Sequence, residues 1–382
     1  ASKNVGIWIV TASALSLGGA DAGNYSLSAT SATDKAEISA LGLTISGAAA
    51  QNKVYDGSIT ATVDFTGASL AGDIESDDVS IDRTGYSAVF ADKNVDTGKT
   101  VTVKGVVLSG TDAGNYTLAQ PTGLKANITP LGITGSFTAE DKVYDGNTAA
   151  VVVDRDLSGV LIGDTVTLTG GTATFADKNV ATDKTVTLTG ATLSGTDAGN
   201  YRLTSVDSAT ADIQVRPIEV TAVADTKVYD GSTASDGIPT ITSSIGLAVG
   251  DSAVWSQTFD TKEAGADKVL TPAGTVKDGN GGANYLVTFV SVKTGLIEKA
   301  NLTVTAENKT SQYSDALLPF KASISGFISG ETFTTSGVTG SPAYSTNPVL
   351  SDPITQAPGI YQIIPEKGTQ IGRASCRGRV YI

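Results

Sequence analysis

The residues with the clearest chemical potential are the Asp and Asn side chains of a repeated turn motif, Gly-Thr-Asp-Ala-Gly-Asn-Tyr. The motif occupies 110–116 and 195–201 and places Asp112, Asn115, Asp197 and Asn200 in turns. Oxygen ligands in turns suit calcium, but the chain has no loop with the Asp-x-[Asp/Asn]-x-[Asp/Asn]-Gly pattern of dedicated calcium sites. Turn capping is therefore the favoured role, with no cofactor expected and calcium as the less favoured alternative.

The composition lacks residue types that enzymes commonly use in catalysis. A hydrolase needs a base such as His, or a carboxylate of raised pKa, beside a nucleophile. The chain has no His and only one Cys, Cys376. We therefore expect no enzyme activity.

Glycosylation and a Lys–Asn crosslink are two less favoured interpretations of the Asn residues. Asn-x-[Ser/Thr] sequons begin at Asn24, Asn115 and Asn127 among others, but Asn200 keeps the turn position without a sequon. The turn therefore requires Asn with or without a sugar. A crosslink between Lys53 and Asn115 would need a buried acid between neighbouring strands and has little support.

A second motif, Lys-Val-Tyr-Asp-Gly, recurs at 53–57, 142–146 and 227–231. Its Gly can take a positive φ, and its Asp can bond the backbone just ahead of it. The strand that ends in the motif should turn sharply and leave the Tyr ring on the core side of its own repeat. The turn residues are Tyr55, Asp56, Gly57, Tyr144, Asp145, Gly146, Tyr229, Asp230 and Gly231.

The end of the first motif has the Asp-x-Gly-x-Tyr spacing of a tyrosine corner, in which a buried Tyr bonds the backbone upstream. The third copy keeps Asn-Tyr and loses the Asp. The corner residues are Asp112, Gly114, Tyr116, Asp197, Gly199, Tyr201 and Tyr285. We predict that Tyr116 and Tyr201 are buried and that both motifs are structural.

Both motifs recur with one period: Tyr55 to Tyr144 is 89 residues and Tyr116 to Tyr201 is 85. A unit of this length is large enough to fold alone, so the chain should be a tandem array. The predicted divisions are the back part of a repeat (1–40), three repeats (41–130, 131–217 and 218–299), a divergent incomplete unit (300–370) and an extraneous tail (371–382). In the divergent unit Tyr313 and Asp315 stand in place of Tyr-Asp-Gly, and 357–361 in place of the corner.

The period-2 alternation of short apolar segments, with turn residues every 8 to 12 positions, predicts an all-β fold. We expect each repeat to be an Ig-like Greek-key β-sandwich. A β-grasp-like unit with one short helix near 157–163 is the alternative. Pro130 and Pro217 mark short junctions without a Gly/Ser tract, so the array should be an extended, monomeric rod.

The net charge and the hydropathy of the chain exclude some classes of partner. The formal net charge of −13 leaves no basic face for a phosphate backbone, so we expect no nucleic-acid partner. The apolar run at 7–10 is too short to span a membrane. The segment 371–382 breaks the composition with Arg373, Arg377 and Arg379 and resembles a translated sequencing adapter. Both ends of the chain look cut from a longer protein.

The Lys-Val-Tyr-Asp-Gly, Ala-Asp-Lys-Asn-Val and Gly-Thr-Asp-Ala-Gly-Asn-Tyr motifs resemble the YDG repeats of large secreted bacterial adhesins of the filamentous haemagglutinin type. Residues 300–370 are similar to the MBG repeats that accompany them. The resemblance implies a stalk displayed on the cell or outer-membrane surface, supporting attachment and biofilm and lacking catalytic residues. Polysaccharide or host glycoconjugate would bind through tip domains elsewhere. The alternative is that the repeats themselves bind such ligands weakly and multivalently.

Overall fold

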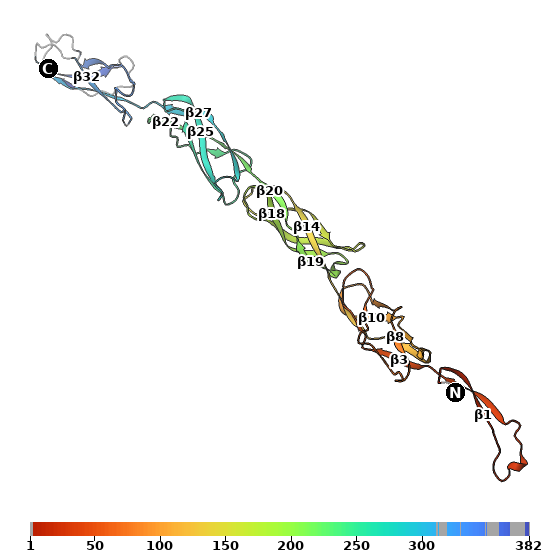
Figure 1. Ribbon diagram of the computed structural model, residues 1–382. Coiled ribbons are helices and arrows are strands. Elements are labelled where there is room, and N and C mark those ends of the chain that lie inside the picture. The colour runs from red at the N-terminus through yellow and green to blue at the C-terminus, as the bar shows by residue number, and fades with distance from the viewer. Residues whose placement is uncertain are drawn as a thin grey trace. The chain divides into compact units, whose positions relative to one another are not determined.

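The computed structural model describes residues 3–310, 312, 319–328, 330–347, 349, 359–366 and 379–381. These residues contain β-strands and three single-turn 3-10 helices but no α-helix. Figure 1 shows the strands in the order of the chain. The chain divides into two compact units. The first comprises 1–140, 149–176 and 185–211, and the second comprises 141–148, 177–184 and 212–382.

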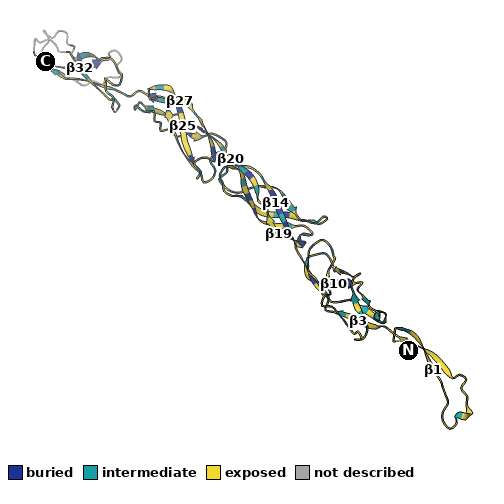
Figure 2. Cartoon of the chain, in the orientation of Figure 1, coloured by how far each residue is buried: buried dark blue, intermediate teal, exposed yellow. Residues whose placement is uncertain are grey.

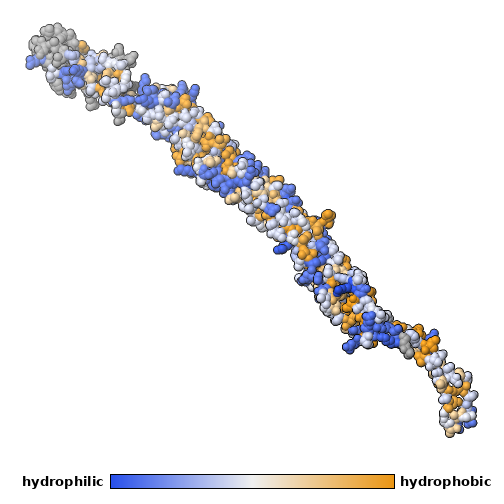
Figure 3. Space-filling view, in the orientation of Figure 1, coloured by the Kyte–Doolittle hydropathy of each residue, from blue (hydrophilic) through white to orange (hydrophobic). Residues whose placement is uncertain are grey.

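The first 38 residues contribute an isolated hairpin. Strands β1 (Gly6–Ser13) and β2 (Ser31–Ile38) pair antiparallel from Gly6 opposite Ile38 to Ser13 opposite Ser31, and η1 (Ala22–Asn24) lies in the loop between them. Nearly every residue of the hairpin is exposed (Figure 2). Figure 3 shows apolar residues on its surface at β1, where Ile7 and Ile9 are exposed. A two-stranded ribbon has no second layer to bury them.

The first repeat is a two-sheet sandwich. One sheet has the order β5-β13-β10-β9 and the other β12-β3-β7, with the short pairs β11-β8 and β4-β6 at the margins. Its elements are β3 (Leu41–Ser46), β4 (Ala49–Ala50), β5 (Lys53–Val54), β6 (Val63–Asp64), β7 (Ser69–Ala71), β8 (Ser80–Asp82), β9 (Ser87–Phe90), β10 (Asp96–Lys104), β11 (Val107–Ser109), η2 (Ala113–Asn115), β12 (Tyr116–Ala119) and β13 (Lys125–Thr129).

The second repeat reuses this plan. Its β14 pairs with β16 antiparallel and with β19 in parallel; β15 pairs with β20 in parallel, and β17 with β18 antiparallel. Its elements are β14 (Leu131–Ala139), β15 (Lys142–Val143), β16 (Val152–Ser158), β17 (Thr167–Phe175), β18 (Ala181–Ser194), η3 (Ala198–Asn200), β19 (Tyr201–Val206) and β20 (Ala209–Gln214).

The third repeat has the sheets β23-β21-β26 and β22-β27-β25-β24, and the last segment has β28-β30 and β29-β33-β32-β31. Their strands are β21 (Arg216–Thr221), β22 (Thr226–Val228), β23 (Thr240–Ile241), β24 (Ser252–Phe259), β25 (Gly265–Lys277), β26 (Tyr285–Val290), β27 (Val292–Glu298), β28 (Thr303–Ala306), β29 (Lys309–Thr310), β30 (Ala322–Ser325), β31 (Ala343–Asn347), β32 (Ile360–Glu366) and β33 (Arg379–Tyr381).

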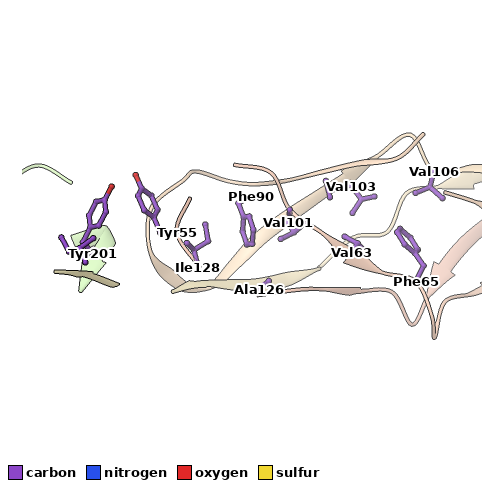
Figure 4. Close-up of a cluster of buried hydrophobic side chains, with 13 residues drawn as sticks. Tyr55, Val63, Phe65, Phe90, Val101, Val103, Val106, Ala126, Ile128 and Tyr201 are labelled. Carbon is purple, nitrogen blue, oxygen red and sulfur yellow. The ribbon is translucent and has the colours of Figure 1, made fainter. Parts of the chain in front are cut away.

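Alternation along the strands produces the core. In β10, Lys99, Val101 and Val103 face inward while the residues between them are exposed. The neighbouring strands of the same sheet add Phe90 and Ile128, and the cluster continues to Tyr201 of the next repeat (Figure 4). The prediction of tandem all-β sandwiches is therefore confirmed.

Each of the two main sheets of the three repeats also contains a parallel pair, which a purely antiparallel Greek key lacks. The strand that opens the repeat pairs in parallel with the strand after the corner, as β3 does with β12. The short strand of each Lys-Val-Tyr-Asp-Gly motif pairs in parallel with the closing strand, as β5 does with β13. Both motifs are thus attached to the sheets by these parallel pairs.

The short helix of the β-grasp-like alternative is absent. Leu157 and Ser158 end β16, and the residues that follow form a turn. Gly159 has a positive φ and reverses the chain at the end of the strand.

The last segment also differs from expectation, because it has a closing strand within the tail that we set aside. Strand β33 pairs with β32 antiparallel and with β29 in parallel. Ladder bonds use backbone groups, which any sequence supplies. The predicted turn residues Tyr313 and Asp315 and residue Ala357 lie outside the described residues, as do 371–378.

Candidate functional site at the repeat junctions

The Tyr-Asp-Gly motifs form turns that the Asp closes. At the first copy, Asp56 Oδ1 accepts a hydrogen bond from the Ser58 amide at 2.8 Å and one from the Lys53 ammonium at 2.7 Å. Gly57 has φ +75°, a conformation that glycine adopts without strain. The same bonds and positive φ recur at Lys142, Asp145, Gly146 and Asn147, and at Lys227, Asp230, Gly231 and Ser232.

The Tyr55 ring belongs to the boundary with the next repeat rather than to the centre of its own. The residue is 1% exposed, and its ring meets the Tyr201 ring edge to face, with centroids 5.4 Å apart. Figure 4 shows the two rings side by side at one end of the cluster, with Phe65 at the other end. The Tyr of one motif therefore packs on the corner Tyr of the following repeat.

The corner Tyr bonds the upstream backbone as predicted in kind, but over a much longer separation. Tyr201 Oη accepts a hydrogen bond from the Leu161 amide, 40 residues earlier, at 3.1 Å. Its own proton goes to Asp164 Oδ2 at 2.7 Å. Tyr116 has the same two partners in Ile74 and Asp77, and Tyr285 has them in Ala248 and Asp251. All three corner Tyr residues are buried.

Asp164 is the hub of this junction. It accepts hydrogen bonds from the hydroxyls of Tyr55 and Tyr201, each at 2.7 Å, and from the Lys93 ammonium at 2.7 Å. Lys93 also lies 3.7 Å from Asp197 Oδ1, and 5.8 Å above the centroid of the Tyr55 ring. One carboxylate therefore joins Tyr55 and Lys93 of the first repeat to its own repeat through charge-assisted bonds, while a cation–π contact holds these two residues together.

The residues after Lys93 add a second attachment. The Val95 amide donates to Asn200 Oδ1 at 2.8 Å, and Asn200 Nδ2 donates to Asn94 Oδ1 at 3.2 Å. Asn200 is 5% exposed and belongs to η3. The Asn of the corner motif therefore binds the Lys-Asn-Val segment of the preceding repeat, which explains why the turn keeps Asn without a sequon.

The same contacts recur between the second and third repeats. There Asp251 accepts from Tyr144 at 3.0 Å and from Tyr285 at 2.7 Å, and its nearest distance to the Lys178 ammonium is 3.5 Å. Asn284 accepts from the Val180 amide at 2.9 Å. The Tyr144 and Tyr285 ring centroids are 5.5 Å apart.

The N-terminal segment meets the first repeat through part of the same set. Lys3 Nζ lies 2.8 Å from Asp77, and the Val5 amide donates to Asn115 Oδ1 at 2.9 Å. These contacts correspond to those of Lys93 and Val95 at the next junction.

The close approach of the next repeat is a second reason why glycine is needed at Gly57 and Gly146. A Cβ on Gly57 would lie 3.3 Å from Leu161 Cδ1, and one on Gly146 would lie 3.2 Å from Ala248 Cβ. The turn of the next repeat therefore packs directly on the glycine. Gly114 and Gly199 have neither a positive φ nor a close neighbour, so nothing in the structure requires glycine there.

Hydrogen bonding sets the charge states of the hub. The bond from Lys93, followed by those from Tyr201 and Tyr55, lowers the pKa of Asp164 to about 2. Burial, and then the bond to Asp164, raises the pKa of Tyr201 to about 12. The bond to Asp164 also raises the pKa of Lys93. The carboxylate, ammonium and neutral hydroxyls that the geometry needs therefore persist over a wide pH range.

We expect the thermal midpoint of the chain to be nearly flat between about pH 5 and about pH 9. The lowered pKa of Asp164 stabilises the fold above its usual value near 3.8, and this contribution is lost as the pH falls towards about 2. The raised pKa of Tyr201 stabilises below about 10, and this contribution is lost as the pH rises towards about 12. Calorimetry across the pH range checks this, and a midpoint that falls steeply between about pH 5 and about pH 7 would contradict it.

The oxygens weighed as calcium ligands already have partners. Asp112 Oδ2 accepts from the Asp78 amide at 3.0 Å, and its Oδ1 lies 3.3 Å from the Lys3 ammonium. Asp197 Oδ2 accepts from the Thr165 amide at 2.9 Å. The described residues contain no group of three or more His, Cys, Asp or Glu placed to hold a metal ion. The cation at these junctions is a lysine ammonium.

Chelation should therefore have little effect. We expect excess EDTA to change the thermal midpoint by less than about 2 °C. A change that affects only surface groups alters the free energy of unfolding by about 0.5 kcal/mol or less. The measurement is differential scanning fluorimetry with EDTA and with added calcium chloride. A calcium-dependent rise of about 10 °C would restore the calcium alternative.

Sequence reasoning missed the acids Asp77, Asp164 and Asp251. Each lies three residues after the amide that binds the corner Tyr, and its own amide closes the turn by bonding the carbonyl of that residue, at 2.9 to 3.1 Å. A signal was present, because successive members of this set are 87 residues apart. The flanking residues differ among the copies, and this concealed the motif.

The folds and contacts together define a class: tandem β-sandwich repeats in which adjacent repeats within each unit share a buried acid and a pair of stacked Tyr rings. The family model for the YDG domain matches residues 39–123, 127–211 and 214–294. The chain therefore belongs to the YDG domain family.

Comparisons with solved structures and with curated proteins do not extend the family assignment. A crystal structure of Drosophila N-cadherin EC1–4 is 12% identical, covers 87% of this chain and 98% of its own, and has a TM-score of 0.23. The I9–I11 tandem from titin is 12% identical, covers 68% of this chain and 100% of its own, and has a TM-score of 0.22. These scores do not establish a shared fold. No curated protein matches the chain. Among the described residues, no helix has the length and apolarity needed to cross a membrane.

Proposed function

We propose that this chain is a stalk segment of a secreted adhesin on a bacterial cell surface or outer membrane. The observation that carries the proposal is the recurrence of one junction geometry in successive repeats. A spacer must resist bending at every junction, and a shared carboxylate, an ammonium and stacked rings restrict rotation there. The MBG-like assignment of residues 300–370, support of attachment and biofilm, and the absence of catalysis belong to the same proposal.

The main alternative assigns ligand binding to the repeats themselves. Sugar sites use exposed aromatic rings for stacking. Here Tyr55, Tyr116, Tyr144, Tyr201 and Tyr285 are each 7% exposed or less. The Tyr rings that recur in the two motifs are thus occupied in cores and junctions. The spacer is favoured, and a polysaccharide or host glycoconjugate would bind to other domains of the protein.

A glycan array probed with the 382-residue chain tests the proposal. We expect no glycan to be retained, because a spacer has no site for one. Retention of a defined glycan class, increasing when the chain is displayed in multivalent form, would support the multivalent alternative and contradict the spacer.

A further inference from the structure

The junction after the third repeat keeps part of the shared geometry. The Tyr229 hydroxyl donates to Glu331 Oε1 at 2.7 Å, and the Glu331 amide closes a turn on the Ile328 carbonyl at 2.8 Å. A Cβ on Gly231 would lie 3.3 Å from Ile328 Cγ2. The Tyr, the acid and the turn that packs on the glycine are therefore all present.

At this junction the equivalent lysine forms no ion pair with the acid. Aligned on the buried Phe that ends β9, β17 and β24, the Lys-Asn-Val segment becomes Lys262-Glu263-Ala264. At the two preceding junctions the equivalent ammonium lies 2.7 and 3.5 Å from the acid, and 5.8 and 5.7 Å from the Tyr ring centroid. Lys262 is exposed and makes no ion pair or hydrogen bond with the part of the chain that the structure describes.

A cavity of about 280 Å³ opens beside this Tyr and acid. Its polar lining consists of Tyr229, Glu263, Lys299, Glu331 and Ser336, and its apolar lining includes Leu302 and Val338. The volume is just below the roughly 300 to 1,000 Å³ of pockets for drug-sized ligands, so it suits a short chain.

The charges of the lining favour a cation. Two carboxylates, Glu263 and Glu331, face one ammonium, Lys299. The hydrogen bond to Glu331 is the main cause that raises the pKa of Tyr229 to about 12, and the charge of Glu263 adds to it. The cavity is therefore negative where it meets the Tyr hydroxyl.

We propose that this cavity binds a primary alkylammonium group, the chemistry that Lys93 and Lys178 supply at the earlier junctions. The ammonium would pair with Glu331 beside the Tyr229 ring, and its methylenes would lie against Leu302 and Val338. A divalent metal fits less well, since calcium takes six to eight oxygen ligands. The ammonium can come from a free amine or from a lysine side chain of a polypeptide.

Titration of the 382-residue chain by NMR, with n-butylammonium chloride as the probe, tests the proposal. We expect saturable shifts at Tyr229, Ala264 and Ile328 with a dissociation constant on the order of millimolar, because the ligand has few atoms. The neutral isostere 1-butanol should bind at least tenfold more weakly. Nα-acetyl-lysine methylamide tests the polypeptide source: equal affinity supports a lysine side chain, and tenfold weaker binding supports a free amine.

Three variants separate the outcomes. Glu331→Gln should weaken n-butylammonium at least tenfold, and Glu263→Gln, at an exposed residue, provides a second loss if Glu331→Gln does not fold. Glu37→Gln, an exposed residue of β2, is the matched control and should bind unchanged. Lys262→Gln should also leave binding unchanged. Absence of saturable shifts in the wild-type chain, or a tenfold gain in Lys262→Gln showing that Lys262 itself fills the cavity, would overturn the proposal.

Discussion

Tyr201→Ala should lower the thermal midpoint of the first unit by about 6 to 20 °C. Truncating a buried aromatic ring costs about 3 to 5 kcal/mol, and each kcal/mol moves the midpoint by about 2 to 4 °C in a unit of this size. Tyr201 is 5% exposed, stacks on Tyr55 and bonds both Leu161 and Asp164. The measurement is differential scanning calorimetry of the 382-residue chain.

Tyr25→Ala is a matched control because Tyr25 ends the same Asp-Ala-Gly-Asn-Tyr motif but is 74% exposed. Its substitution should move the midpoint by less than about 2 °C, as surface changes do. If the two variants lost equal stability, burial of the corner ring at the junction would not be the cause. Tyr116→Ala should behave like Tyr201→Ala, since Tyr116 is 7% exposed.

Asp164→Ala should destabilise the first unit by about 2 to 6 kcal/mol. The change removes the acceptor of two Tyr hydroxyls, and each buried polar group left without a partner costs about 1 to 3 kcal/mol. The Lys93 side chain is 37% exposed, so water can solvate its ammonium and it adds little. Hydrogen exchange should rise at 55–57 and at 161–164, on both sides of the junction.

The control is Asp156→Ala, in β16 of the same repeat. Asp156 is exposed and accepts a hydrogen bond only from the adjacent Leu157 amide. It should leave stability within about 0.5 kcal/mol of the wild type. A loss in Asp164→Ala no larger than this would show that the shared carboxylate does not hold the repeats together.

The repeated motifs and the alternating strands could be predicted from the sequence because they follow local rules. Tyr-Asp-Gly requires a turn with positive φ, and period-2 segments such as Val101 and Val103 place one face in a core. The short helix of the β-grasp-like alternative, near 157–163, does not form because the apolar spacing there is short and ambiguous, and Gly159 follows the strand instead.

The contacts between adjacent repeats could not be predicted from local sequence rules. The sequence indicates that Tyr55 and Tyr201 each need a buried place, but it does not say that they share one. Their contact joins residues 146 positions apart through an acid whose neighbours vary. Only the constant spacing of Asp77, Asp164 and Asp251 marked that acid in advance.

Small-angle X-ray scattering of the 382-residue chain tests most directly the claim that the junctions hold the repeats apart. Taking about 35 Å for each of the three whole repeats from the strand rise, and adding the two partial units, we predict a maximum dimension on the order of 130 to 160 Å, unchanged by EDTA. A compact particle of about 60 Å, the size expected for a globular chain of this length, would contradict the stalk.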